Sequence, residues 1–184
     1  ARTLGGWKKR GLAAWDGDVP SALTALSDWL DARLIADAQA TLIHNDFKLD
    51  NVILNPNTHA PVAVIDWDMG TRGDPRWDLA VMLGYWTEAG DPDTMLELNQ
   101  MPTAGHGFPN REAIANYYAE LSGADMTGFH FIRVLAVFRA AVIFRQLYIR
   151  YVSGDTDDPR FVKFGESADG LLNFAIDIAN EKYF

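Results

Sequence analysis

The sequence predicts an α+β fold that is predominantly helical and contains a single β-hairpin. Over most of the chain, apolar residues recur every three or four positions, which is the spacing of a helix with one buried face. One short stretch differs, because the apolar runs 52–54 and 61–65 flank a turn that contains Asn, Pro and Thr. This pattern is typical of two antiparallel strands joined by a short loop.

The bulk composition is that of an ordinary globular protein. The 184 residues can bury a sizeable core, so we expect residues 1–184 to form one domain. The net charge of −9 and the absence of a Lys/Arg block argue against a nucleic-acid partner. Without cysteine, neither a disulfide framework nor a thiolate metal site is available. The N-terminus lacks the apolar core of a signal peptide, so a cytoplasmic location is expected.

One apolar segment, residues 129–149, has the length of a membrane span. Arg133, Arg139 and Arg145 interrupt it, and each arginine would cost roughly 2.5–3.5 kcal/mol near the centre of a bilayer. Successive residues of a helix are about 100° apart, so the three side chains point in different directions and share no polar stripe. We therefore expect no membrane partner, but a central core helix in which each arginine reaches an edge or a carboxylate.

The first forty residues predict two helices. The first covers residues 2–15 and ends before the break at 17–20. The second is expected to run from Ser21, as its N-cap, to about Ala38. Its apolar face consists of residues at helical spacing, Leu23, Leu26, Leu30 and Leu34.

Further helices are expected after the hairpin. Asp74 as N-cap and Pro75 at the first helical position begin a helix that is expected to close at residues 90–92. Its buried face contains Leu79, Met82, Leu83 and Trp86. The remaining helices are expected at 110–121, with Asn110 as the N-cap, at 129–151 and at about 166–181.

A polar cluster, residues 44–51, precedes the hairpin and reads His-Asn-Asp-Phe-Lys-Leu-Asp-Asn. The apolar runs 40–43 and 52–54 flank it, which is typical of a loop held on a rigid frame, where chemistry is often located. The spacing His-x-Asp-x-x-x-x-Asn is that of the kinase catalytic loop. In that loop the Asp accepts a hydroxyl proton and the Asn holds magnesium.

The predicted hairpin places Asp66 beside the end of this loop. If Leu54 pairs near Ala63, Asn51 and Asp66 lie at the same open end of the hairpin, on adjacent strands. Adjacent strands are about 4.8 Å apart. The two side chains could therefore share one metal ion.

Three motifs together carry a family resemblance. Residues 42–52 (Leu-Ile-His-Asn-Asp-Phe-Lys-Leu-Asp-Asn-Val), 64–68 (Val-Ile-Asp-Trp-Asp) and 73–80 (Gly-Asp-Pro-Arg-Trp-Asp-Leu-Ala) strongly resemble the aminoglycoside phosphotransferase-like family. The residues of the first motif look most like the branch of this family that is related to kinase-like domains attached to acyl-CoA dehydrogenases. The resemblance implies a protein-kinase-like C-terminal lobe, a small-molecule hydroxyl as phosphate acceptor, and ATP and Mg²⁺ as cofactors.

The resemblance assigns roles to individual residues. Asp46 corresponds to the catalytic base, while Asn51 and Asp66 correspond to the magnesium ligands. Lys48 corresponds to a lysine that approaches the transferred phosphate in many protein kinases, although a surface lysine is the alternative. Asp78 resembles the helix aspartate that fastens the backbone of the catalytic loop, and its alternative is a first-turn carboxylate favoured by the helix dipole.

Three other polar side chains near the motifs are given structural roles. His44 is expected to brace the loop and not to shuttle protons. Asp68 and Asp74 are interpreted as capping groups or as side chains that support the ligands.

The family pattern is incomplete at its N-terminal side. No glycine-rich nucleotide loop precedes His44, and Lys8 and Lys9 lie in a helical context instead of a strand. Residues 161–163 (Phe-Val-Lys) look like the strand lysine, but they follow the catalytic loop in the chain. We therefore expect a C-terminal lobe whose nucleotide lobe is missing, and which is inactive on its own.

Other functions are weighed against this one. The Asp66-x-Asp68 pattern is also found in haloacid-dehalogenase-type phosphatases, but that fold needs alternating strands and helices, and the sequence after residue 71 predicts helices. A metal-binding glycosyltransferase would need a nucleotide-sugar domain. A half-kinase that serves only as a binding or scaffolding module would need neither metal ligands nor a base.

Overall fold

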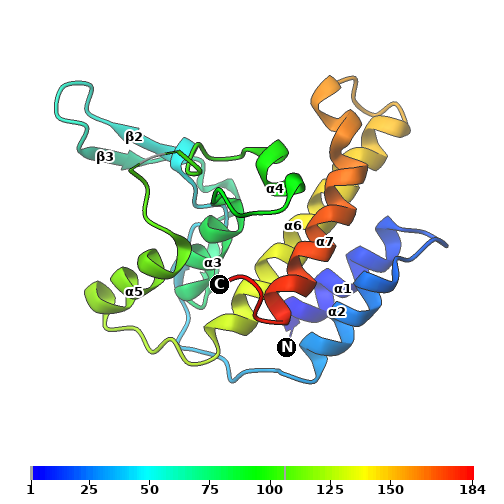
Figure 1. The fold of residues 1–184 in the computed structure, drawn as a ribbon, viewed down its shortest axis with the longest axis horizontal. Coiled ribbons are helices and arrows are strands. Elements are labelled where there is room, and N and C mark those ends of the chain that lie inside the picture. The colour runs from blue at the N-terminus through cyan, green and yellow to red at the C-terminus, as the bar shows by residue number, and fades with distance from the viewer. Residues whose placement is uncertain (1, 106) are drawn as a thin grey trace. The chain divides into compact units, whose positions relative to one another are not determined.

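The computed structural model describes residues 2–105 and 107–184 of the chain. They form two compact units (Figure 1). One unit combines the segment up to Ile35 with His130–Phe184, and the other consists of Ala36–Phe129. The assignment of residues 1–184 to one domain, the C-terminal lobe, stays a prediction.

The first unit is a helical assembly around a long helix. Its core contains side chains that are almost fully buried, among them Leu23, Leu30, Phe138, Leu172 and Phe174. Helix α2 packs against both α7 and α1. The helices are α1 (Arg2–Ala14), α2 (Ser21–Asp31), α6 (Phe129–Val152) and α7 (Phe164–Ala179), and a short 3₁₀ helix, η3 (Pro159–Lys163), precedes α7.

The long helix α6 confirms the prediction of a central core helix. In the part of the chain that the structure describes, no helix combines the length and the apolar character that a membrane crossing requires. Arg133 and Arg139 are buried, and Arg133 donates a hydrogen bond to the backbone carbonyl of Phe184. Arg145 donates to the carbonyl of Ala14 at 3.3 Å. These two arginines therefore reach backbone carbonyls, an acceptor that we did not predict.

The expected second helix is shorter than predicted. Helix α2 ends at Asp31, seven positions before Ala38. Helices in proteins are stabilised chiefly by burial of one face, and Leu34, predicted to continue that face, is 52% exposed. The N-cap assignment of Ser21 is also wrong, because Ser21 is the first helical residue and Pro20 occupies the cap position.

The second unit contains the predicted hairpin. Strands β2 (Val52–Leu54) and β3 (Pro61–Val64) pair antiparallel. Ile53 stands opposite Ala63, so the expected pairing of Leu54 with Ala63 is displaced by one residue. An irregularity between Ile53 and Leu54 then places Leu54 opposite Pro61. Proline cannot donate to a strand ladder, which is why such irregularities accompany it.

A second strand pair was not predicted. Strands β1 (Thr41–Ile43) and β4 (Thr71–Gly73) pair antiparallel, with Ile43 opposite Thr71 and Thr41 opposite Gly73. Gly73 lies close to Ile43, because a Cβ at position 73 would come within 2.7 Å of Cδ1 of Ile43 and would force that side-chain end to move. The pair fixes both ends of the segment 44–70, which contains the polar loop and the hairpin. The loop after β1 and the loop before β4 therefore leave from the same small sheet.

Three helices complete this unit: α3 (Arg76–Tyr85), α4 (Asp93–Leu98) and α5 (Arg111–Ser122). The predicted start of α3 is early by one residue, because Pro75 occupies the cap position and Arg76 is the first helical residue. The Asp74 carboxylate accepts the N–H of Arg76 at 2.9 Å. The predicted end of α3 is wrong, because the backbone is already extended at Trp86. Asn110 caps α5 as predicted, by accepting the N–H of Ala113 at 2.8 Å.

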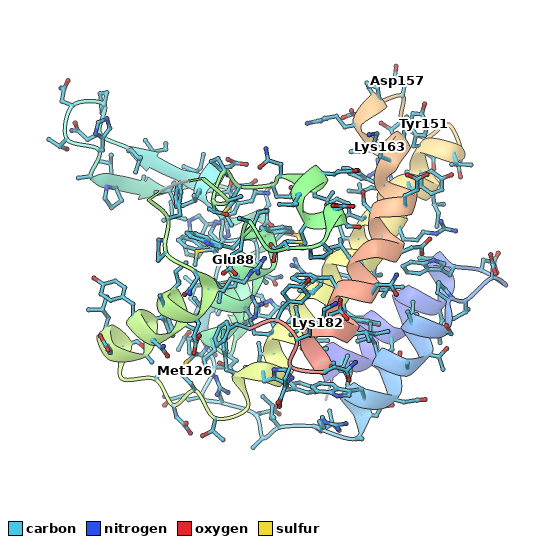
Figure 2. All side chains as sticks on the ribbon, in the orientation of Figure 1. Glu88, Met126, Tyr151, Asp157, Lys163 and Lys182 are labelled. Carbon is cyan, nitrogen blue, oxygen red and sulfur yellow. The ribbon has the colours of Figure 1, made fainter. Side chains whose placement is uncertain are left out.

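The early end of α3 is accompanied by a buried ion pair. The guanidinium of Arg111 donates to the carboxylate of Asp91, and both side chains are 1% exposed. Arg111 also donates to the backbone carbonyls of Leu83 and Trp86, at the end of α3. Glu88, labelled in Figure 2, accepts the backbone N–H of Arg111. One arginine therefore ties the start of α5 to the segment that follows α3.

The segment 161–163, which superficially resembles a kinase strand lysine, is not a strand. It belongs to η3, and Lys163 is its last residue. Figure 2 shows Lys163 at the same end of its unit as Tyr151 and Asp157. This lysine is therefore part of the turn between α6 and α7.

Candidate active site

The carboxylate of Asp78 holds the start of the polar loop 44–51. Its Oδ2 accepts the backbone N–H of His44 and its Oδ1 accepts that of Asn45, both at 2.7 Å. Charged acceptors make the strongest such bonds. Asp78 lies in the first turn of α3, so a helix end fixes the loop. The predicted fastening role of Asp78 is confirmed.

His44 links the polar loop to the loop after the hairpin. Its ring is buried, with the residue 1% exposed. Nδ1 accepts the backbone N–H of Asp46 at 3.3 Å, so Nε2 carries the proton and donates to the carbonyl of Ile65 at 2.8 Å. The ring also lies 4.7 Å from that of Trp67. These contacts confirm the bracing role predicted for His44.

Asn45 makes a second link between the same loops. Its backbone is left-handed, with φ of 66°. The side-chain oxygen accepts the indole N–H of Trp77 at 2.7 Å, and the side-chain nitrogen donates to the carbonyl of Met69 at 3.2 Å. Sequence reasoning missed Asn45 and Trp77, although both lie inside the motifs that it used.

Asp46 and Lys48 form an ion pair with Nζ and Oδ2 3.0 Å apart. Burial alone would lower the pKa of Lys48, but the hydrogen bond and the negative charge of Asp46 outweigh it and raise that pKa above the ordinary value of 10.5. Lys48 therefore stays charged at neutral pH. Its ammonium also lies 5.7 Å from the centre of the Tyr85 ring.

Asn51 is the buried end of the loop, with 6% of the residue exposed. Its Nδ2 donates to the backbone carbonyl of Asp46 at 2.9 Å. An amide that donates through its nitrogen keeps its oxygen as an acceptor. The backbone carbonyl of Asn51 accepts the N–H of Ile65 at 2.9 Å, so Asp66 follows directly. The predicted placement of Asn51 and Asp66 at one end of the hairpin is confirmed.

Asp66 begins the loop between β3 and β4. Its backbone is left-handed, with φ of 64°, and its side chain is exposed. Its carboxylate accepts no hydrogen bond and joins no ion pair among the residues that the structure describes. The next residue, Trp67, donates its indole N–H to the carbonyl of Val64 at 2.9 Å and so anchors the turn.

Asn51 and Asp66 fit a magnesium ion by their chemistry. Both offer hard oxygen donors, and Mg²⁺ is usually held by one or two protein ligands together with water and phosphate. Across residues 2–105 and 107–184, no group of three or more His, Cys, Asp or Glu side chains could enclose a metal.

The fold and these loops define a class of protein. A loop that carries an Asp and an Asn five residues further on, held beside an Asp that follows the hairpin, is the arrangement of kinase-like phosphotransferases. Both strand pairs in the described part of the chain are antiparallel. They do not form the alternating strands and helices that the Asp-x-Asp phosphatase alternative requires.

A comparison with protein families agrees with this class of protein. The model of the phosphotransferase enzyme family (APH) matches residues 1–117, and the chain belongs to this family. A solved structure from Ralstonia eutropha JMP134, described as a candidate aminoglycoside phosphotransferase, superposes with a TM-score of 0.81 and 23% identity. The match covers 98% of this chain and 55% of that chain, and it shows the kinase-like fold.

Curated relatives confirm the predicted branch. Acyl-CoA dehydrogenase family member 11 of Homo sapiens is 29% identical over 188 residues, which are 99% of this chain and 23% of that protein. Acyl-CoA dehydrogenase family member 10 of Mus musculus is 28% identical over 180 residues, which are 97% of this chain and 17% of that protein. The chain therefore spans less than a quarter of the length of these relatives.

Proposed function

We propose that this chain carries the catalytic loop of an ATP-dependent kinase that phosphorylates a hydroxyl group of a small molecule. The hydrogen bond from Asn51 to the carbonyl of Asp46 is the observation that carries the proposal. It ties the base and one metal ligand of the kinase pattern into a single rigid loop. Phosphoryl transfer depends mainly on positioning and electrostatics, so a rigid loop is what the reaction requires.

Asp46 is the proposed base. Its work is to orient the acceptor hydroxyl and to accept the proton as the bond to phosphorus forms. Lys48, which stays charged beside it, holds the carboxylate in position through their ion pair. The same ammonium would also offset negative charge on the phosphate during transfer.

Asn51 and Asp66 are the proposed magnesium ligands. Magnesium supplies neutralisation of the β- and γ-phosphate charges when it is bound. The bond from Asn51 Nδ2 to Asp46 leaves Oδ1 for the metal. Among the described residues, no cation pairs with the exposed Asp66 carboxylate. His44 joins the two ligand loops through Ile65, so the two ligands are held by one brace.

The nucleotide-binding lobe is the proposed partner of this chain. Described residues before His44 form α1, α2 and β1, and none of them provides a glycine-rich loop or a strand lysine. The groups that cradle the phosphates therefore come from an N-terminal lobe, without which the chain is inactive. The cytoplasmic location predicted from the sequence accompanies this proposal.

The test compares two proteins, the chain itself and a longer protein in which a nucleotide lobe precedes it. ATP consumption is measured over a panel of hydroxylated acceptors, with and without Mg²⁺. We expect Mg²⁺-dependent transfer by the longer protein and none by the short chain. Phosphatase activity of the short chain that Asp66→Asn abolishes would favour the phosphatase alternative. Absence of both activities, together with a tight protein partner, would favour a scaffold.

A further inference from the structure

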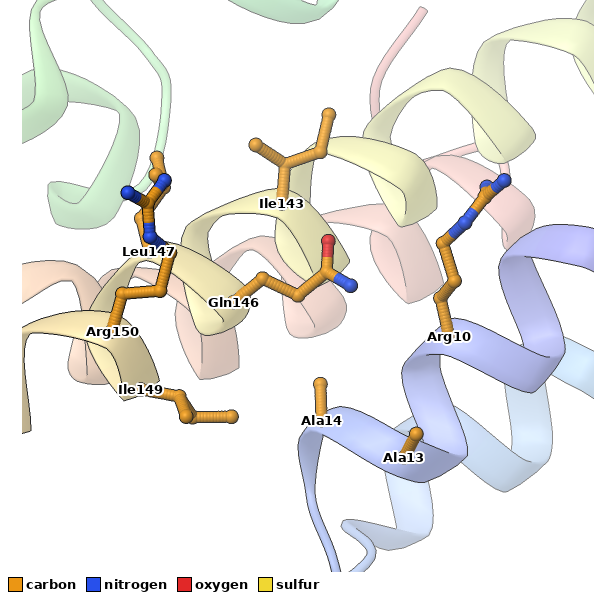
Figure 3. A pocket seen from close by; sticks show the side chains of 8 residues that line it. All are labelled: Arg10, Ala13, Ala14, Ile143, Gln146, Leu147, Ile149 and Arg150. Atoms are coloured by element: carbon orange, nitrogen blue, oxygen red, sulfur yellow. The ribbon is translucent and has the colours of Figure 1, made fainter. Parts of the chain in front are cut away.

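A groove runs along the first unit, between α1 and α6 (Figure 3). Its volume is about 470 Å³, within the range of roughly 300–1,000 Å³ that is typical of small-molecule sites. None of its residues belongs to the candidate active site. The groove is lined by Arg10, Ala13, Ala14, Ile143, Gln146, Leu147, Ile149 and Arg150.

The shape of the groove follows from small residues on α1. At Gly11, α1 approaches both α2 and α6, because a Cβ there would lie 3.1 Å from Leu23 of α2 and 3.3 Å from Val142 of α6. In the next turn of α1, Ala13 and Ala14 face α6 with side chains too short to fill the space. Arg145 then holds the end of α1 by donating to the carbonyl of Ala14. The space is therefore bounded by fixed helices.

The floor of the groove is apolar and its rim is cationic. Ile143, Leu147 and Ile149 come from α6, and Figure 3 shows Gln146 between the guanidinium groups of Arg10 and Arg150. Arg10 lies over the ring of Trp7 at 4.2 Å, which orients it. Neither Arg10 nor Arg150 is paired with a carboxylate within the described residues.

The surrounding charge is unusual for this chain. Helix α1 contains four basic residues and no acidic one, and α6 contains four arginines and no acidic residue. The chain as a whole has a net charge of −9. Of these basic residues Arg10 and Arg150 line the groove, and their positive charges attract anions to it and repel cations.

We propose that this groove binds a small amphipathic anion, with an aliphatic tail on the apolar floor and an anionic head attracted by Arg10 and Arg150, which flank that floor. Guanidinium groups bind carboxylate and phosphate through paired hydrogen bonds. Because Trp7 already orients Arg10, less side-chain freedom is lost on binding.

Isothermal titration calorimetry of the chain with hexanoate, octanoate and decanoate tests whether the aliphatic tail binds the apolar floor. Affinity is expected to rise about fourfold per methylene until the floor is covered. Octanoate and octyl phosphate are compared to identify the preferred head. Octanol and octyltrimethylammonium, all below their micelle concentrations, are the neutral and cationic controls. Equal affinity for either control, or no binding of any anion, overturns the proposal.

Matched variants locate the site. Arg10→Gln and Arg150→Gln are each expected to weaken octanoate binding roughly tenfold or more. Arg160→Gln removes the same charge from an arginine that is outside the groove and paired with Asp158, and it should leave affinity unchanged. Ala13→Leu should fill the groove and abolish binding while the chain melts like the parent. Equal weakening by Arg160→Gln, or full binding by Ala13→Leu, contradicts this location.

Discussion

The carboxylate of Asp78 accepts the backbone N–H of His44 at 2.7 Å, although the two residues are separated by the whole hairpin. The other carboxylate oxygen accepts the N–H of Asn45 at the same distance. Two adjacent N–H groups of the polar loop are thus satisfied by one side chain from the first turn of α3. The position of the polar loop 44–51 therefore depends on one side chain from α3.

Asp78→Asn is expected to destabilise the chain by about 1.5–3 kcal/mol, because the amide replaces one charged acceptor with a donor that faces an N–H. Chemical denaturation measures the loss. Asp93 is the matched control, since it is an exposed first-turn carboxylate of α4. If Asp93→Asn costs as much as Asp78→Asn, the helix dipole explains the effect and the fastening role is wrong.

Asp46→Asn, in the longer protein with a nucleotide lobe, is expected to keep nucleotide binding and to lower transfer by about 10²–10⁴-fold, because the amide cannot accept the proton. Calorimetry measures binding and a coupled assay measures ATP consumption. Asp50→Asn, which changes an exposed carboxylate of the same loop, should keep its activity. Equal turnover by the parent and Asp46→Asn would refute Asp46 as the base.

Removal of the Asp66 carboxylate is expected to weaken Mn²⁺ binding, used as a spectroscopic substitute for Mg²⁺, about tenfold or more. The reason is that a charged hard ligand is lost from a site with two protein ligands. Electron paramagnetic resonance of free Mn²⁺ measures the affinity. Asp68→Asn, two residues further on and also exposed, is the control. The ligand assignment fails if both variants bind Mn²⁺ as the parent does.

Arg111→Met is expected to destabilise the chain by roughly 3–5 kcal/mol, because it leaves the buried carboxylate of Asp91 without its partner. The double variant Arg111→Met/Asp91→Leu should recover most of that loss, since two apolar groups replace two buried charges. Denaturation of the four proteins in a double-mutant cycle measures the coupling. Additive losses would show that the pair is not coupled.

The pH dependence of stability should report the Asp46–Lys48 pair. The folded chain raises the pKa of Lys48 above 10.5, so its contribution is complete below about that pH and is lost as pH rises through the higher folded value. The difference in unfolding free energy between the parent and Lys48→Met should therefore be constant from neutral pH to about 10.5 and then decrease. A difference that already falls near neutral pH would contradict the raised pKa.

The elements with strong local signals were predicted from the sequence. Asn110, with its capping side chain, and Asp74-Pro75 specify helix starts through bonds within a few residues. The hairpin and the polar loop were also predicted, because their turn residues and apolar strands are adjacent in the chain. The register of the hairpin differs from the predicted one by one residue. The irregularity at Leu54 arises from its pairing with Pro61 on the opposite strand, which no local pattern signals.

The parts that were missed depend on contacts between distant residues. Strands β1 and β4 are three residues long, and their pairing needs the close approach of Gly73 to Ile43, which no local pattern signals. Helix α2 ends early because its apolar face is not buried as far as Leu34, which is exposed. The contacts of Asn45 with Trp77 and Met69 likewise join segments far apart in sequence.

The left-handed backbone at Asn45 and Asp66 has a consequence for directed evolution. For a residue with a side chain this conformation costs about 1 kcal/mol or more, and glycine adopts it freely. Glycine at position 66 would therefore tend to stabilise the folded chain while it deletes the carboxylate. Selection for heat resistance alone is therefore expected to enrich Asp66→Gly. If Asp66 is the magnesium ligand that we propose, the most heat-resistant variants would have lost that ligand.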